Sequence, residues 1–209
     1  MKESVYTGDR VMSENKRVSK ISRKTKETDI TIEIDLDGTG KADVTTGIGF
    51  LDHMLDSFAR HGLFDLKVRA VGDIHVDSHH LIEDTGIVLG EAIREAVGDK
   101  KGIKRYGYFI LPMDEALVLS AVDLSDRPYL VFDVRFSTPS MGDYDTQMVR
   151  EFFYAVSYSA RMNLHLRQLS GDNDHHICEA CYKSFAKALM GAVEKNPRID
   201  DVLSTKGKI

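Results

Sequence analysis

The sequence predicts an α+β fold built from two similar halves. Apolar residues alternate along several segments at strand spacing and recur along others at helical spacing. The motif His-His-x-x-Glu occurs twice, at 79–83 and at 175–179, and each copy follows a polar turn and opens an apolar segment. This recurrence in the same local context indicates a duplicated α+β unit whose halves pack into one pseudo-symmetric body.

The first half contains strand and helix signals in alternation. Apolar residues at every second position from Ile30 to Leu36 predict a half-buried strand, and the turn at 37–40 leads the chain back into a second strand. Helical spacing begins at Phe50, and Gly62 is the stop signal. The expected elements are strands at 28–36, 41–45 and 66–70 and helices at 50–62 and 79–97.

The second half repeats the order helix, strand, helix. Its expected elements are strands at 108–113, 117–123, 129–136 and 163–168 and helices at 146–161 and 177–193. His75 and His165 are expected on strands as structural residues. Residues 1–20 lack an apolar period and are expected to form a flexible N-terminal extension. The predicted organisation is therefore this extension (1–20), a first half (21–105), a second half (106–197) and a C-terminal tail (198–209).

Composition excludes several classes of function. The chain has 209 residues, 42% of them hydrophobic and 29% charged, with a formal net charge of −5, as in folded soluble proteins. An acidic chain is not expected to bind nucleic acid, so the basic run at 16–26 is interpreted as a solvated or intersubunit segment. No apolar stretch approaches the roughly 20 residues that a membrane helix needs, and no secretory signal is recognised. With only two cysteines, we expect a cytoplasmic protein.

The two His-His-x-x-Glu copies indicate a metal centre. Successive helical residues point about 100° apart, so the two histidines of a pair do not both face one ion comfortably. The glutamate, three or four positions later, lies on the same side of the helix as one or other histidine. Each copy is therefore suited to supply ligands to two ions, or to share ligands with the other copy. Imidazole and carboxylate without thiolate suit an octahedral ion such as manganese or iron better than a closed zinc site. The alternative is that these residues only begin a helix and meet its dipole.

Cys178 and Cys181 interrupt the second copy and suggest a competing zinc set with His175 and His176. Their spacing is poor for a zinc finger, and no thioredoxin-like context precedes this Cys-x-x-Cys. We therefore expect two small, partly buried thiols.

Longer motifs resemble a known family. They are GIGFLDHML (47–55), ARHGLFDL (59–66), DSHH (77–80), EDTG (83–86), PMDE (112–115) and NDHH (173–176) with Glu179. Over about residues 23–207 the chain resembles imidazoleglycerol-phosphate dehydratase of histidine biosynthesis. The resemblance implies a fold like ribosomal protein S5 domain 2, with two four-stranded sheets and helices packed between them. It also implies dehydration of D-erythro-imidazole-glycerol phosphate to imidazole-acetol phosphate, two Mn²⁺ per active site, and a homo-oligomer of 24 subunits built from trimers with shared active sites.

The same resemblance implies metal ligands. The two sets are His53, His80 and Glu83 with one histidine of the second pair, and His79, Glu179 and either His175 or His176. The sequence leaves the assignment of the second pair open. Glu151 stands where some members of the family have histidine, so it is a candidate ligand, with a solvated helix glutamate as the alternative.

Substrate contacts are implied on the same basis. A phosphate calls for cationic and hydroxyl donors, and the matching positions, several of them in the tail, are Arg105, Arg127, Lys183, Ser204, Thr205 and Lys206. Glu27 matches a glutamate that reaches the substrate glycerol from a neighbouring subunit; it is a candidate for proton transfer, with Glu83 and Glu179 as competitors. His53 and His61 match substrate-lining positions, although His61 could equally be structural.

Two other functions stay open on the residues alone. A metal-dependent hydrolase would use two ions to activate water, and would release inorganic phosphate. A metal storage protein would turn nothing over.

Overall fold

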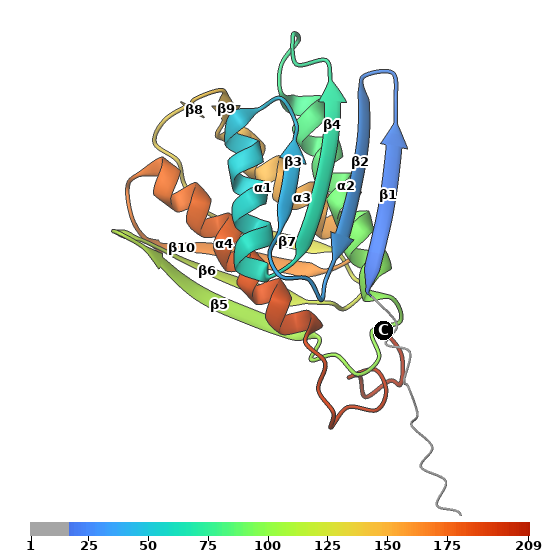
Figure 1. The fold of residues 1–209 in the computed structure, drawn as a ribbon. Helices are drawn as coiled ribbons and strands as arrows, with labels where there is room; N and C mark the ends of the chain where they lie inside the picture. The colour runs from blue at the N-terminus through green and yellow to red at the C-terminus, as the bar shows by residue number, and fades with distance from the viewer. Residues whose placement is uncertain (1–16) are drawn as a thin grey trace, which may run out of the picture.

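The computed structural model describes residues 17–209, drawn in colour in Figure 1. Most of the expected N-terminal extension, residues 1–16, lies outside the described residues. The expectation is wrong for its last part, because strand β1 (Val18–Lys24) already begins at Val18. Ser19 is buried and its hydroxyl donates to the carbonyl of Ala92 at 2.7 Å. An edge strand with mostly exposed side chains shows no apolar period, which is why the sequence pattern missed it.

The first sheet has the strand order β1-β2-β4-β3. Its further members are β2 (Thr28–Asp35), β3 (Ala42–Thr45) and β4 (Asp65–Gly72). The chain reverses after β2 as expected, but the returning strand β3 lies beside β4, in parallel, and not beside β2. The crossing is held by Asp65, whose Oδ1 accepts hydrogen bonds from the backbone of Thr39 at 2.8 Å and of Lys41 at 3.0 Å.

The second sheet repeats this topology. Its order is β5-β6-β10-β7, with β7 parallel to β10 and the other neighbours antiparallel. The strands are β5 (Tyr106–Met113), β6 (Ala116–Asp123), β7 (Tyr129–Asp133) and β10 (Asn163–Ser170). A short hairpin of β8 (Ser140–Met141) and β9 (Tyr144–Asp145) precedes the third helix. The shared strand order confirms the duplicated α+β fold.

The four helices of residues 17–209 fill the space between the sheets (Figure 1). They are α1 (Gly49–Gly62), α2 (His79–Val97), α3 (Gln147–Ser159) and α4 (Asp174–Val193). Helix α2 packs on β1 and β2 and against α3, and α4 packs on β5 and β6 and against α1. The ring of Phe58 stacks on Phe185 with centroids 5.5 Å apart, which joins α1 to α4 in the core. No helix within residues 17–209 is long and apolar enough to cross a membrane.

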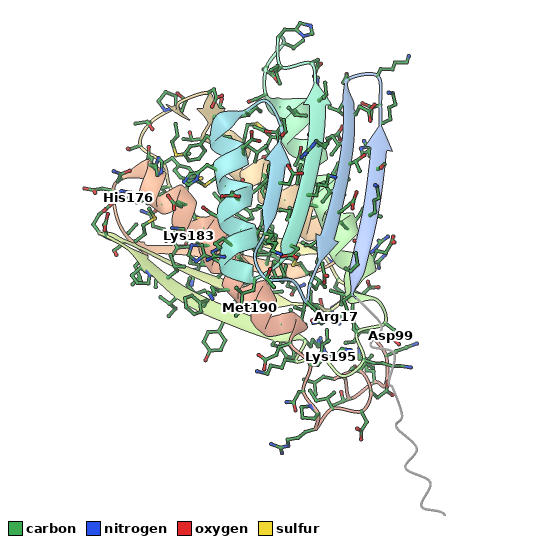
Figure 2. The ribbon with its side chains drawn as sticks, in the orientation of Figure 1. Arg17, Asp99, His176, Lys183, Met190 and Lys195 are labelled. Atoms are coloured by element: carbon green, nitrogen blue, oxygen red, sulfur yellow. The ribbon has the colours of Figure 1, made fainter. Side chains whose placement is uncertain are left out.

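Two features of the helices and turns bear on the site. Helix α4 begins at Asp174, three residues before the expected start, so its histidine pair lies in the first turn, as the pair of α2 does. Figure 2 shows His176 near one end of α4 and Met190 near the other. His75 is not on a strand, because β4 ends at Gly72 and His75 lies in the exposed turn that follows. His165 lies on β10 as expected.

Candidate metal centre

The two histidine pairs begin their helices in the same way. The backbone N–H of His79 donates to the carboxylate of Asp77 at 2.8 Å, and that of His175 donates to the side-chain oxygen of Asn173 at 3.0 Å. A side-chain acceptor at this place satisfies a backbone donor that the helix itself leaves free. Each pair is therefore fixed at the rigid start of a helix, at the edge of the core.

One group of candidate ligands forms where α1 packs against α4. Nε2 of His53 lies 3.6 Å, and Nε2 of His175 3.2 Å, from Oε2 of Glu179, and the three ligand atoms lie within 4.8 Å of one another. The Glu179 side chain is only 8% exposed, whereas both rings are half exposed. His53 and His175 also line a cavity of about 710 Å³. The group thus has a buried carboxylate at its base and two imidazole rings that a ligand can reach.

Lys183 completes this group in a way the sequence did not predict. Its Nζ lies 2.5 Å from Oε1 of Glu179, one helical turn away. Burial opposes ionisation of Glu179, but the hydrogen bond from Lys183 and the nearby His53 and His175 hold its pKa below the usual range. His61 lies close enough that burial and the charge of Lys183 lower its pKa. In this chain Lys183 therefore supports a candidate metal ligand.

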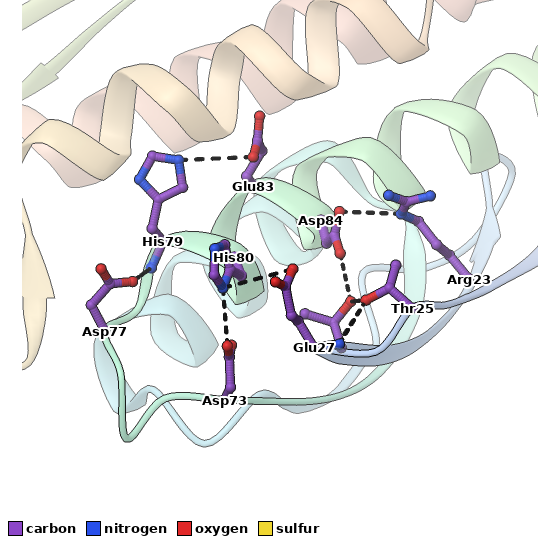
Figure 3. Close-up of polar contacts among 10 residues, drawn as sticks. Arg23, Thr25, Glu27, Asp73, Asp77, His79, His80, Glu83 and Asp84 are labelled. Carbon is purple, nitrogen blue, oxygen red and sulfur yellow. Dashed lines mark hydrogen bonds and ion pairs between the residues drawn. The ribbon is translucent and has the colours of Figure 1, made fainter.

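A second group forms at the start of α2 (Figure 3). It consists of Glu27, Asp73 and His80, whose ligand atoms lie within 4.8 Å of one another. Nδ1 of His80 is 3.0 Å from Oδ2 of Asp73 and 3.9 Å from Oε2 of Glu27. The hydrogen bond with Asp73 raises the pKa of His80. Beside this group, Nε2 of His79 lies 3.8 Å from Oε2 of Glu83.

The second half offers the counterpart of this contact. Nδ1 of His176 is 2.9 Å from Oε2 of Glu115, a residue of the β5–β6 turn. The contact raises the pKa of His176 and lowers that of Glu115 to about 2. Asp73 and Glu115 received no role from the sequence, because Glu115 is 61 residues from His176 and Asp73, seven residues before His80, belongs to no repeated motif.

The single chain does not form the ligand sets that the resemblance implied. Among residues 17–209, His53 is grouped with His175 and Glu179, and His80 belongs to a separate group. The reason is the packing of α1 against α4, whereas α2 packs against α3. Glu151 lines a small pocket of about 220 Å³ together with His79, although its Oε1 also accepts a hydrogen bond from Arg150 at 2.8 Å. Its role as a ligand stays a prediction.

The cysteines take no part in these groups. Cys178 and Cys181 are fully buried rather than partly buried, and burial raises the pKa of each thiol. Neither belongs to a candidate ligand group of the described chain. Both point into the core because helix positions three apart share a face. The donor set is therefore imidazole and carboxylate alone, which fits manganese or ferrous iron.

A basic pocket forms at the other end of the molecule. It has a volume of about 590 Å³, and its lining includes five of the predicted phosphate contacts: Arg105, Arg127, Ser204, Thr205 and Lys206. Lys208, which the sequence did not single out, lines it too. Lys183, the sixth predicted contact, is bound to Glu179 instead. The tail thus gathers cationic and hydroxyl donors suited to a phosphate.

These features define the class of the protein as an α+β enzyme with candidate metal-ligating groups at two helix starts and a separate basic pocket. The comparisons with known proteins make the assignment specific. The family profile described as imidazoleglycerol-phosphate dehydratase matches residues 46–189. The chain belongs to the imidazoleglycerol-phosphate dehydratase family, the hydro-lyases of histidine biosynthesis.

Relatives of known name and structure agree. The imidazoleglycerol-phosphate dehydratase of Lachnoclostridium phytofermentans is 62% identical over 193 residues, covering 92% of this chain and 98% of that protein. That of Acetivibrio thermocellus is 55% identical over 193 residues, covering 92% and 99%. The crystal structure of the enzyme from Staphylococcus aureus has a TM-score of 0.78 at 39% identity, covering 86% of this chain and 99% of that one. The structure from Pyrococcus furiosus in complex with (S)-C348 has a TM-score of 0.79 at 40% identity, covering 90% and 100%.

Proposed function

We propose that the protein catalyses the manganese-dependent dehydration of D-erythro-imidazole-glycerol phosphate to imidazole-acetol phosphate, with two Mn²⁺ per active site. The observation that carries the proposal is the convergence of His53, His175 and Glu179 on one point beside a cavity. When bound, the two ions would supply Lewis acidity at the imidazole nitrogens of the substrate, which favours loss of the neighbouring hydroxyl. Imidazole and carboxylate donors without thiolate suit such an ion.

The carboxylates divide into different roles. Both oxygens of Glu179 have partners, since Oε1 meets Lys183 and Oε2 meets His53 and His175. Such a group holds a ligand position better than it moves a proton. The side chains of Glu27 and Glu83 are 56% and 41% exposed, so they are free to approach a substrate. We assign the proton transfer to one of these two.

The position of the basic pocket supports active sites shared between subunits of a homo-oligomer. Both histidine pairs lie in the first turns of α2 and α4. The tail pocket adjoins the last turns, since the backbone N–H of Arg105 donates to the carbonyl of Ala192 and Lys101 pairs with Val202. Helices of 19 and 20 residues span about 30 Å. A small phosphate ester cannot reach both ends, so a neighbouring subunit supplies the phosphate pocket.

A direct assay tests the function. Purified protein is stripped with a chelator and incubated with imidazole-glycerol phosphate, with and without added Mn²⁺. We expect imidazole-acetol phosphate only with the metal. Release of inorganic phosphate would favour a hydrolase, and metal uptake without turnover would favour storage.

Two variants sharpen this assay. Glu179→Gln should keep the assembly and lose turnover, whereas the control Glu33→Gln, at an exposed pair with Lys20, should keep both. Full activity of Glu179→Gln would refute its role.

A complementation experiment tests the sharing of sites. Glu179→Gln and Arg127→Ala chains are coexpressed with different tags, and the mixed oligomer is purified. If one site combines the metal group of one chain with the pocket of another, part of the activity returns. Complete inactivity of the mixture would indicate sites built within a single chain.

A further inference from the structure

The second histidine of each pair is held at the same ring atom by a carboxylate from outside the motif. Nδ1 of His80 lies 3.0 Å from Oδ2 of Asp73, and Nδ1 of His176 lies 2.9 Å from Oε2 of Glu115. An ionised carboxylate only accepts hydrogen bonds, so each ring donates its Nδ1–H. In the neutral ring, Nε2 then carries the free electron pair that a metal ion needs.

The first histidine of each pair behaves differently. His79 and His175 direct Nε2 towards the glutamates of their own motifs, at 3.8 Å and 3.2 Å. The two rings of a pair are 6.2 Å apart and turned edge to face, by 72° in the first pair and 86° in the second. The two rings of each pair therefore contact different carboxylates, the first that of its own motif and the second one from outside it.

A second hydrogen bond holds the Glu115 carboxylate in place. Its Oε1 accepts a hydrogen bond of 3.0 Å from the backbone N–H of Asn173, the residue whose side chain begins α4. One carboxylate therefore joins the β5–β6 turn to both the helix start and the ring of His176. Both of its oxygens are in use, which fixes the ring in one orientation.

Asp73 makes the corresponding contact with His80 from a different part of the fold. It follows β4, and its Oδ2 contacts His80 (Figure 3). Its buried Oδ1 has no hydrogen-bond partner within residues 17–209, so the donation from His80 is the one side-chain hydrogen bond of this carboxylate there. The hydrogen bond with His80 therefore offsets part of the free-energy cost of burying this carboxylate.

We propose that Asp73 and Glu115 are positioning residues that fix the tautomer and ring orientation of His80 and His176, so that Nε2 of each is presented to a metal ion. The proposal rests on the proposed metal dependence and adds to it the residues that prepare these ligands. Carboxylates behind metal-binding histidines act in this way in many metal sites.

The proposal also explains why the halves differ at one carboxylate. Glu27 and Glu115 each stand just before the second strand of a hairpin, β1–β2 and β5–β6 respectively. Glu115 contacts the histidine directly, whereas Glu27 stays 3.9 Å from Nδ1 of His80. In the first half Asp73, and not Glu27, makes the hydrogen bond with the histidine. Glu27 is thereby left free for the substrate.

Metal affinity tests the proposal independently of turnover. Mn²⁺ is titrated into chelator-treated full-length protein by calorimetry, with free Mn²⁺ followed by electron paramagnetic resonance. Asp73→Asn and Glu115→Gln should each weaken Mn²⁺ binding about 10- to 100-fold. The matched controls Asp133→Asn and Glu33→Gln remove exposed carboxylates paired with Arg167 and Lys20, and should bind as the wild type does.

Further measurements separate positioning from a purely structural role. Glutamine offers one acceptor oxygen in place of two, so Glu115→Ala should bind Mn²⁺ more weakly than Glu115→Gln, while the unfolding temperatures of the metal-free proteins stay similar. The proposal is overturned if Asp73→Asn and Glu115→Gln both bind Mn²⁺ with wild-type affinity. It is also overturned if the affinity falls only in variants whose unfolding temperature is lower. If the wild-type protein binds Mn²⁺ but turns over no substrate, the proposed function is overturned instead. The ratios of variant to wild-type Mn²⁺ affinity still decide the role of the two carboxylates in that case.

Discussion

Oδ2 of Asp84 accepts a hydrogen bond of 2.5 Å from the hydroxyl of Thr28, which joins the start of β2 to α2. Oδ1 of Asp84 accepts another from Nε of Arg23 at 3.1 Å. The hydroxyl of Thr25 in turn accepts hydrogen bonds from the backbone of Glu27 and Thr28. A buried carboxylate next to Glu83 thus fixes the hairpin that carries Glu27.

Loss of this connection should destabilise the first half. We expect Asp84→Asn and Thr28→Val each to lower the free energy of unfolding by about 1–3 kcal/mol, because each leaves a buried polar group without its partner. The double variant should lose less than the sum of both, since the two changes remove one shared hydrogen bond. Urea unfolding measures the effect. The control Ser22→Ala removes an exposed hydroxyl contact with Thr31 and should change little; additive losses at positions 28 and 84 would contradict the coupling.

The contact between α2 and α3 depends on glycine. A Cβ added at Gly90 would lie 2.7 Å from the carbonyl oxygen of Val156, and one at Gly86 would lie 2.8 Å from that of Phe152. Because backbone cannot move aside locally, Gly90→Ala should destabilise the protein by about 1–3 kcal/mol. Gly49→Ala is the control, since a Cβ there meets nothing within 4 Å. Thermal unfolding should show a lower midpoint for Gly90→Ala alone, and equal midpoints would refute the close approach.

Asp65 provides a pH-dependent contribution to stability. Backbone hydrogen bonds from Lys41 and Thr39 lower its pKa below the ordinary value of 3.8. The stabilisation is therefore present above that value and is lost as the pH falls through the lower folded pKa. We expect Asp65→Asn to cost about 1–2 kcal/mol at neutral pH and progressively less below about pH 4. Denaturant unfolding at several pH values measures the difference. The control Asp133→Asn removes an exposed carboxylate and should cost little at neutral pH, and a cost at Asp65 that is independent of pH would contradict the argument.

Arg105 links the basic pocket to the second sheet. Its Nη1 donates to the carbonyl of Leu203 at 2.7 Å, while Nε and Nη2 donate to Asp123. Arg105→Ala should release the tail and raise KM for the phosphate substrate about tenfold or more, with a smaller effect on kcat. Arg161→Ala is a matched control, because Arg161 also has a positive φ and pairs with an aspartate, at an exposed site. Steady-state kinetics give KM for both variants. Equal KM values for Arg105→Ala and Arg161→Ala would argue against a role for Arg105.

Most of the secondary structure and the duplication were predicted from the spacing of apolar residues and from the repeated motif. The helices and most strands follow from residues that recur at fixed spacing, as in α1 and β2. The duplication was visible because His-His-x-x-Glu stands at the start of both α2 and α4. These properties depend on neighbours within a few positions, so the sequence contains them locally.

Contacts between distant residues needed the tertiary structure. The sequence did not predict that β4 separates β2 from β3 or that Val18 already belongs to a sheet. The resemblance groups His53 with His80, and within one described chain the packing of α1 on α4 places His53 beside Glu179.

The sequence by itself therefore determined the kind of donors and the elements that carry them, because residue type and periodicity are properties of the chain. Only the tertiary structure decided which donors meet and which carboxylate contacts each ring. Those relations are set by helix packing, strand order and the course of the turns, which are not properties of residue type or spacing.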